Sequence, residues 1–496
     1  MDQQLTPLLS QILASAKRDH AAFYTPGHKQ GQGASAMLRS LVGSAALKAD
    51  LPELPELDNL FAPEGVIAEA QDLAAAAFGA EQSWFLANGS TCGIEAAVLA
   101  TCSPGDRILI PRNAHRSVIS ALVLSGAMPV YLQPVYDPDW DLVGGVDPAA
   151  IAMALETHPE IRAVLLVSPT YQGISSDLSA IADIVHAHGI PLLIDAAHGA
   201  HFGFHPALPQ SALATGADLA VQSTHKTLGA LTQAAMVHIQ GARIDRDRLS
   251  QALQLTQSTS PNYLLLASLD AARQQMAIAG EKLMAQTIEL AIATHQKLEQ
   301  IPGIKVFSLP KDRQNPGFHT SDPTRLTIDV TRLGLSGFNA DELLHNIYGV
   351  TAELPTLRQL TFIISLGNTP QDIEELVTGF TQLAQHHRHS PTPPLPHSPT
   401  PFPPSSLPPL SPRDAFFAPT ETVSTAQATG RISSELICPY PPGIPLILPG
   451  EKITQEAIAA LQHINQSGGI ITGCTDTSLE TWRVVKNLSP RPPHRL

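Results

Sequence analysis

Short apolar runs alternate with helical patterns between about residues 66 and 245, and this alternation constrains the fold more than any other feature. Helices are predicted over 68–78 and 94–101. The apolar runs that predict strands lie near Trp84, Ile108, Val130, Val164, Leu192, Leu219 and Met236. Strands that alternate with helices are typical of a mainly parallel sheet covered by helices. We therefore expect an α/β fold whose ligands bind at the carboxyl ends of the strands.

Composition and charge narrow the classes of function. The chain has 496 residues, of which 43% are hydrophobic and 15% charged, so it can build several domains with large cores. Its formal net charge is −14, and it lacks the basic cluster that nucleic-acid binding requires. An acidic surface mildly favours cationic substrates, although net charge more often serves solubility alone.

Cysteine usage and the start of the chain predict a cytoplasmic protein. The four cysteines lack the CxxC or Cys/His spacing of a zinc site, so we expect reduced thiols and no metal. The first five residues lack the basic start and apolar run of a signal peptide. No stretch approaches about 18 uncharged apolar residues, which argues against a membrane span.

A lysine follows one of the predicted strands, in the run Ser223-Thr224-His225-Lys226. Such a run is where certain enzymes bind pyridoxal phosphate, because the lysine amine forms a Schiff base with the cofactor aldehyde. An isolated lysine is more often a solvated surface residue. A second motif 31 residues upstream, which begins at Asp195, favours the cofactor interpretation.

Asp195 directly follows the apolar run 191–194 and precedes Ala-Ala-His198. A carboxylate at the end of a buried strand is costly without a positive partner, and a protonated pyridine nitrogen is such a partner. Asp195 would keep that nitrogen protonated, so that electrons released at the substrate α carbon can enter the ring. The alternative is an aspartate that caps the next helix.

Two further motifs predict the rest of a cofactor site. Small and hydroxyl residues in 87–96 lie between a predicted strand and a predicted helix, where backbone N–H groups bind anions. Ser90 and Thr91 are the predicted phosphate donors, with Ser223 as a third, and an ordinary helix N-cap is the alternative. His115 follows the strand 107–110, so that its ring can lie flat on the cofactor face.

Beyond this region a long helix is predicted from Leu264 to about Gln300, followed by a smaller α/β domain that ends near His386. Residues 390–413 are dominated by Pro, Ser and Thr, which predicts an extended linker. A docking site for a proline-recognising partner is the alternative there. The predicted domains are an N-terminal segment 1–65, a large cofactor-binding domain 66–300, a small domain 301–389, the linker 390–413 and a C-terminal domain 414–496.

Taken together, the motifs resemble the fold-type I, pyridoxal-phosphate-dependent ornithine/lysine/arginine decarboxylases, in the shorter form of bacterial arginine decarboxylases. The resemblance covers roughly residues 5–385 and 414–490, and the linker departs from the compact family pattern. The matching motifs are 25–29, 53–60, 111–117, 195–198, 223–226, 440–445 and 449–451. The resemblance implies an aspartate aminotransferase-like large domain with a mainly parallel sheet, a small α/β domain and a C-terminal α+β domain.

The resemblance also implies roles for single residues. Lys226 is implied to be the Schiff-base lysine, Asp195 the partner of the ring nitrogen and His115 the residue stacked on the ring. The residues implied to hold the phosphate are Ser90, Thr91, Ser223 and His225.

Three more residues are placed by the resemblance alone. His198 lies beside the cofactor at a position that varies between branches of the family. His28 belongs to an N-terminal segment that approaches the active site of a dimer partner in such enzymes. Glu451 is similar to a residue of the C-terminal domain near the substrate side chain.

The implied reaction is decarboxylation of a basic amino acid, with arginine to agmatine in polyamine synthesis preferred over lysine to cadaverine or ornithine to putrescine. Lys226, His225 and His198 are all candidates for the general acid that protonates the α carbon. The other open functions are a different reaction on the same scaffold, such as an aminotransferase or aldolase, and a non-catalytic cofactor-binding regulator. The resemblance implies a homodimer or a higher homo-oligomer.

Overall fold

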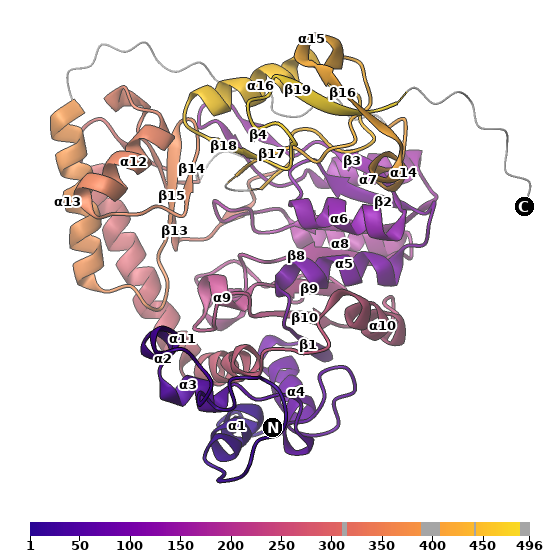
Figure 1. The fold of residues 1–496 in the computed structure, drawn as a ribbon. Helices are drawn as coiled ribbons and strands as arrows, with labels where there is room; N and C mark the ends of the chain where they lie inside the picture. Colours follow the sequence, from indigo (N-terminus) through magenta and orange to yellow (C-terminus); the bar gives the residue numbers. More distant parts are fainter. Residues whose placement is uncertain (310–314, 388–406, 441–442, 487–496) are drawn as a thin grey trace, which may run out of the picture. The chain divides into compact units, whose positions relative to one another are not determined.

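The computed structural model describes residues 1–309, 315–387, 407–440 and 443–486. Two compact units are present. The first comprises Met1–Thr101, Pro191–Glu289 and Ser365–Gly367, and the second comprises Cys102–Ile190, Leu290–Ile364 and Asn368–Leu496. Each unit is described by itself below, and Figure 1 gives the element labels.

Strands of the first unit lie in the order β1-β10-β9-β8. Their bounds are β1 (Gln82–Leu86), β8 (Leu192–Asp195), β9 (Leu219–Gln222) and β10 (Ala235–Ile239). Strands β8 and β9 are parallel, whereas β10 is antiparallel to both of its neighbours. The connection from β9 to β10 contains only the helix α9 (Thr224–Thr227) and a loop, which is too short for a full crossover helix.

Several helices complete the first unit. They are α1 (Pro7–Ala16), α2 (Ala36–Val42), α3 (Ser44–Ala49), α4 (Val66–Phe78), α5 (Gly89–Thr101), α10 (Arg246–Thr256) and the beginning of α11 (Tyr263–Glu299). The core of this unit joins residues of α1 and α4 to Phe85 and Met236 of the sheet and to Leu266 of α11. Helix α5 is longer than the predicted helix 94–101, because it already begins at Gly89.

The second unit contains the parallel strands β2 (Arg107–Pro111), β3 (Met128–Leu132) and β6 (Ile161–Val167), in the order β6-β2-β3. Its helices here are α6 (Arg116–Ser125), α7 (Pro148–Thr157) and α8 (Leu178–Ala187). The short strands β4 (Tyr136–Asp137), β5 (Leu142–Val143), β7 (Ile174–Ser175) and β12 (Thr320–Ser321) form two small ladders. All seven predicted strands of the region 66–245 are therefore present.

A smaller antiparallel sheet follows in the second unit, in the order β11-β13-β15-β14. Its elements are β11 (Lys305–Val306), β13 (Arg325–Asp329), α12 (Gly337–Tyr348), β14 (Leu354–Pro355), β15 (Gln359–Ile363) and α13 (Pro370–His387). Helices α12 and α13 pack beside the sheet (Figure 1), and the end of α11 shares their core. The predicted helix from Leu264 to Gln300 and the predicted domain end near His386 agree with α11 and α13.

The C-terminal part has its own core around Ile437, Ile458 and Trp482. Its elements are α14 (Pro412–Phe417), β16 (Thr420–Ser424), α15 (Thr425–Ala428), β17 (Cys438–Tyr440), α16 (Gln455–Gln466), β18 (Ile470–Thr472) and β19 (Thr481–Val485). Helix α14 begins inside the predicted linker, because Ser411 accepts a hydrogen bond from the Asp414 backbone N–H and proline occupies the first turn. The rest of the linker up to residue 406 lies outside the described residues, and the domain boundaries stay a prediction.

Asp58 organises the entry into α4. Its carboxylate accepts backbone hydrogen bonds from Glu64 at 3.1 Å, Gly65 at 2.8 Å and Ile67 at 3.1 Å. Burial raises the pKa of Asp58, but the backbone hydrogen bonds outweigh it and leave this pKa below its ordinary value. The motif 53–60, which the sequence singles out, thus fixes the start of a core helix.

Asp58→Ala should lower the free energy of unfolding by about 1 to 2 kcal/mol at pH 7, because the amide donors at the helix start lose their acceptor. A carboxyl whose pKa is lowered in the folded state stabilises that state fully at pH values above its unfolded pKa of about 4. This contribution is lost as the pH falls through the lower pKa of the folded state. The difference from wild type should therefore shrink below about pH 4. Urea unfolding across this range measures it, and a pH-independent difference would contradict the account. Asp72→Ala, an exposed change in the same helix, is the matched control.

Candidate active site

The lysine loop begins where β9 ends. Ser223 is the N-cap of α9, and Lys226 lies within this four-residue helix. The Nζ atom of Lys226 lies 3.0 Å from Nε2 of His198. The structure therefore brings together two of the predicted site residues that are 28 positions apart in the sequence.

Asp195 is the last residue of β8, and β8 is parallel to β9. The carboxyl ends of parallel neighbours meet at one edge of a sheet, so Asp195 and the lysine loop share this edge. The Asp195 side chain is buried and accepts a hydrogen bond from the Ala197 backbone N–H at 3.2 Å. Burial raises the pKa of Asp195, while the charge of Lys226 opposes the rise. A buried carboxylate of this kind fits a protonated ring nitrogen, which would supply the charge that burial demands.

Ser90 and Ser223 also meet in the structure. Their hydroxyl oxygens lie 2.8 Å apart at the N-terminus of α5. The preceding turn is fixed, because Gln257 accepts from the Ala87 backbone N–H at 2.7 Å and Gln233 donates to the Ala87 carbonyl at 2.7 Å. Two hydroxyls at the start of a 13-residue helix suit a phosphate group, since the helix dipole and its N–H groups favour anions.

A close approach of α5 to the sheet sets the height of this turn. A Cβ atom on Gly93 would lie 2.7 Å from Leu86 Cδ1 and 2.8 Å from Val221 Cγ1, so a larger residue would force these side chains or the helix to shift. Thr91 lies in the same turn with an exposed side chain. The ring of His225 is fixed by a 2.9 Å hydrogen bond between Nδ1 and the Ala234 carbonyl. The phosphate roles of these residues stay predictions.

His115 and Glu451 belong to the second unit. His115 is the N-cap of α6, and its Nδ1 accepts from the Ser117 backbone N–H at 3.2 Å. Glu451 forms an ion pair with Arg112 at 3.1 Å. Burial raises the pKa of Glu451, and the Arg112 guanidinium opposes the rise.

Arg112 was missed at the sequence level. A charged residue directly after the buried strand β2, inside the motif 111–117, was the signal that could have found it. Ser117, whose hydroxyl lies beside Nδ1 of the His115 ring, was also missed. Its role depends on the cap of α6, which the sequence alone does not reveal.

His28 lies in the N-terminal segment of the first unit. Its Nε2 lies 2.9 Å from Oδ2 of Asp50, and its Nδ1 accepts from the Gly31 backbone N–H at 3.0 Å. Both ring nitrogens thus have partners within this segment. The predicted role of His28 toward a substrate stays a prediction.

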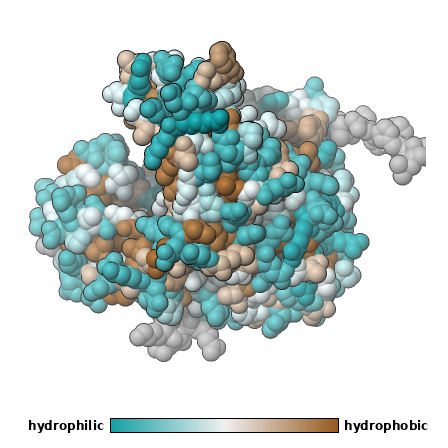
Figure 2. All heavy atoms as spheres, turned by 90° about the horizontal axis from the view of Figure 1, so that it is seen from below, coloured by the Kyte–Doolittle hydropathy of each residue, from teal (hydrophilic) through white to brown (hydrophobic). Residues whose placement is uncertain are grey.

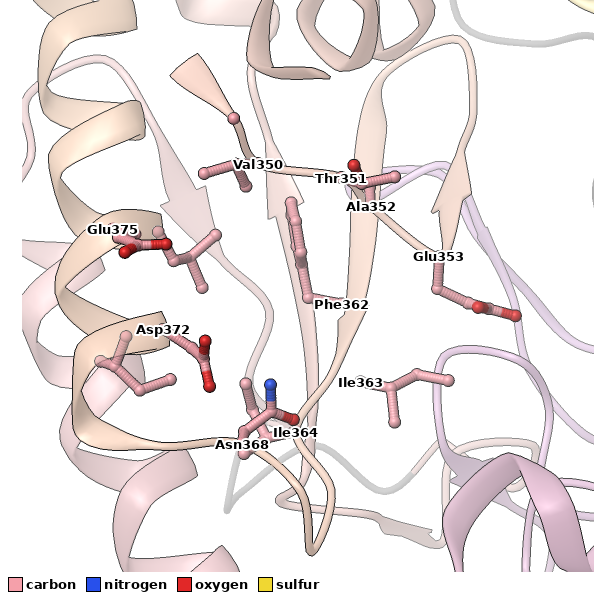
Figure 3. Close-up of a pocket in the computed structure, with 13 residues that line it drawn as sticks. Val350, Thr351, Ala352, Glu353, Phe362, Ile363, Ile364, Asn368, Asp372 and Glu375 are labelled. Atoms are coloured by element: carbon pink, nitrogen blue, oxygen red, sulfur yellow. The ribbon is translucent and has the colours of Figure 1, made fainter. Parts of the chain in front are cut away.

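A groove on the small sheet contains none of the predicted site residues. It is lined by apolar side chains that include Val350, Phe362 and Ile364, with Glu353 and Asp372 nearby (Figure 3). The Asp372 carboxylate is already engaged by the Thr369 backbone N–H at 2.6 Å and hydroxyl at 2.9 Å. This groove is therefore not part of the candidate active site.

The buried aspartate at the end of β8, the lysine after β9 and the hydroxyls at the start of α5 belong to an α/β fold of the fold-type I, pyridoxal-phosphate-dependent class. A lysine decarboxylase of Francisella novicida has this fold, with a TM-score of 0.83 at 24% identity over 97% of this chain and 81% of that chain. The ureidoglycine-glyoxylate aminotransferase of Bacillus subtilis shares it more distantly, with a TM-score of 0.51 at 14% identity over 65% and 85%.

The sequence comparisons define the family. Residues 6–372 match the major domain of the Orn/Lys/Arg decarboxylases, and residues 406–471 match their C-terminal domain. An arginine decarboxylase of Halalkalibacterium halodurans is 38% identical over 98% of both chains. An arginine decarboxylase of Bacillus subtilis is 38% identical over 98% of this chain and 99% of its own. The chain belongs to the Orn/Lys/Arg decarboxylase family, and it is an enzyme of the decarboxylase class.

Proposed function

We propose that the protein binds pyridoxal phosphate and decarboxylates arginine to agmatine. The observation that carries the cofactor assignment is the meeting of Asp195, His198 and Lys226 at the carboxyl edge of β8 and β9. The names of the relatives at 38% identity favour arginine, with lysine and ornithine as the other substrates of the family. Agmatine is a polyamine precursor, which would place the reaction in polyamine synthesis.

When bound, pyridoxal phosphate supplies an aldehyde on which the substrate amine takes the place of a lysine amine, and a ring that takes up the electron pair left on the α carbon as carbon dioxide departs. Lys226 would hold the cofactor through its amine. Asp195 would keep the proton at the ring nitrogen, because a buried carboxylate is stabilised by a cation. The hydroxyls of Ser90 and Ser223 would bind the phosphate.

Proton transfer at the α carbon is the remaining task. His198 Nε2 lies 3.0 Å from Lys226 Nζ, so these two groups can exchange a proton directly. His225 is tied to the Ala234 carbonyl through Nδ1. We therefore propose that Lys226, with His198 as its proton partner, protonates the α carbon after carbon dioxide leaves.

We also propose a cytoplasmic homodimer. Among the described residues, no helix combines the length and the apolar character that crossing a membrane requires. The four cysteines are not paired in disulfides. The N-terminal segment exposes Phe23, Met37 and Leu41 by 94%, 85% and 83%. Figure 2 shows apolar patches among the hydrophilic surface, and a second copy of the chain would cover such surface.

The purified protein, supplied with pyridoxal phosphate and offered arginine, lysine and ornithine separately, should release carbon dioxide and form agmatine fastest. Lys226→Ala should lower kcat by more than about 10³-fold, because it removes the covalent attachment and a proton-transfer group, the latter alone worth about 10² to 10⁴-fold. Lys282→Ala, an exposed change in α11, is the control and should retain full activity. Amine formation from none of the three substrates would overturn the proposal.

Light scattering should give twice the chain mass of 52.7 kDa or a higher even multiple. Replacing both Met37 and Leu41 by serine should shift the protein toward the monomer, because the apolar surface that a partner covers is lost. A wild-type protein that is monomeric at micromolar concentration would contradict the dimer.

A further inference from the structure

The connection between β9 and β10 contacts two parts of the candidate site. Lys226 lies in α9 near the start of this connection, and Gln233 lies two positions before β10. Nε2 of Gln233 donates a 2.7 Å hydrogen bond to the Ala87 carbonyl. Ala87 begins the segment 87–91 that leads to Ser90, which is called the phosphate turn below. All of these residues belong to the first unit, so one short connection joins the lysine to the phosphate turn.

Gln233 has an unusual backbone conformation. Its φ is +83°, in the left-handed region that residues with a Cβ atom rarely adopt. The Ala234 backbone N–H donates to the Leu231 carbonyl at 3.0 Å, so Gln233 is the third residue of a tight turn. Glycine or asparagine is usual at this position when φ is positive. A glutamine that keeps the more costly conformation indicates a function for its side chain.

Residues 233 and 234 lie between the lysine loop and the phosphate turn. The Ala234 carbonyl accepts a 3.2 Å hydrogen bond from the His225 backbone N–H and lies 2.9 Å from Nδ1 of the His225 ring. On the other side, a Cβ atom on Gly89 would lie 3.7 Å from the Gln233 carbonyl oxygen. The neighbour of Lys226 and the start of α5 are therefore both in contact with the same two residues.

A second glutamine holds the same peptide from the side of α10. Oε1 of Gln257 accepts from the Ala87 backbone N–H at 2.7 Å. The Asn88 side chain donates to the Thr256 carbonyl at 3.3 Å, and the Thr256 hydroxyl lies 3.3 Å from the Cys92 carbonyl. Ala87 is only 5% exposed, so water would replace a lost partner poorly. Both polar groups of the Ala87 backbone thus depend on glutamine side chains.

We propose that Gln233 and Gln257 are positioning residues that hold the phosphate turn in place relative to Lys226, and that they give the site its preference for a phosphorylated cofactor. Neither glutamine has to touch the cofactor. The inference rests on the proposed function, in which Ser90 and Ser223 bind the phosphate of pyridoxal phosphate. Donors that are fixed before the ligand arrives bind it more tightly, because no ordering cost is paid on binding.

Two ligands and three variants test the proposal. Gln233→Gly and Gln257→Met each remove one hydrogen bond to Ala87, and glycine adopts the positive φ without strain. The Kd values of pyridoxal phosphate and of pyridoxal, which lacks the phosphate, are measured by fluorescence titration of the cofactor-free protein. The Tm of the cofactor-free protein is measured alongside. Gln240→Met is the matched control, because Gln240 donates to the Leu213 and Ala217 carbonyls, both at 2.8 Å, elsewhere in the first unit.

Both test variants should raise the Kd of pyridoxal phosphate by about 3- to 10-fold, the effect of one lost hydrogen bond that orders the turn. The Kd of pyridoxal should stay at the wild-type value, so the preference for the phosphorylated ligand falls by the same factor. The Tm of Gln233→Gly should stay close to that of wild type, because the release of backbone strain offsets the lost hydrogen bond. Gln240→Met should lower Tm and leave both Kd values unchanged.

Two results would overturn the inference. Equal rises in the Kd of both ligands would show that the glutamines act on the ring or on Lys226 and not on the phosphate turn. Wild-type Kd values together with a lowered Tm would reduce the glutamines to a structural role. If Gln257→Met does not fold, Gln233→Gly alone gives the answer, since its substitution relieves strain.

The titrations separate this inference from the proposed function. A wild-type protein that binds pyridoxal phosphate without forming an amine would overturn the proposed decarboxylation and leave the positioning test intact. Unchanged affinity for pyridoxal phosphate in both variants of an active enzyme would overturn the positioning role alone.

Discussion

The buried carboxylate of Asp195 is the constraint on which the candidate site depends. Burial opposes its charge, and the parallel pairing of β8 with β9 brings a compensating cation, Lys226, to the same edge of the sheet. An uncompensated acid at this place would be costly, so a cationic ring nitrogen would stabilise the site as well as serve the proposed chemistry. The fold and the reaction thus require the same pair of strands.

The remaining parts of the site hold their groups at fixed distances. Gly93 lets α5 lie directly on β1 and β9, which places Ser90 beside Ser223. Asp58 fixes the start of α4 in the same unit. Gln233 and Gln257 hold the backbone of Ala87, where the phosphate turn begins. Each restraint depends on a glycine or a side chain whose role appears only in three dimensions.

The sequence predicted the strands and long helices well, because their apolar patterns are local. It also assigned Ser90 and Ser223 to one phosphate site and His198 and Lys226 to one cofactor, and in the structure Ser90 meets Ser223 and His198 meets Lys226. It did not predict the antiparallel direction of β10 or the Arg112–Glu451 pair. Strand direction here follows from a short connection, and the ion pair joins residues 339 positions apart, which no local pattern encodes.

The central claim is that Lys226 forms the covalent bond to the cofactor. Reduction of the pyridoxal-phosphate-loaded protein with borohydride, followed by proteolysis and peptide mass spectrometry, tests it most directly. The account predicts a reduced phosphopyridoxyl group on the peptide that contains Lys226, and on that lysine alone. A modified lysine elsewhere in the chain, or no modified lysine after loading, would contradict it.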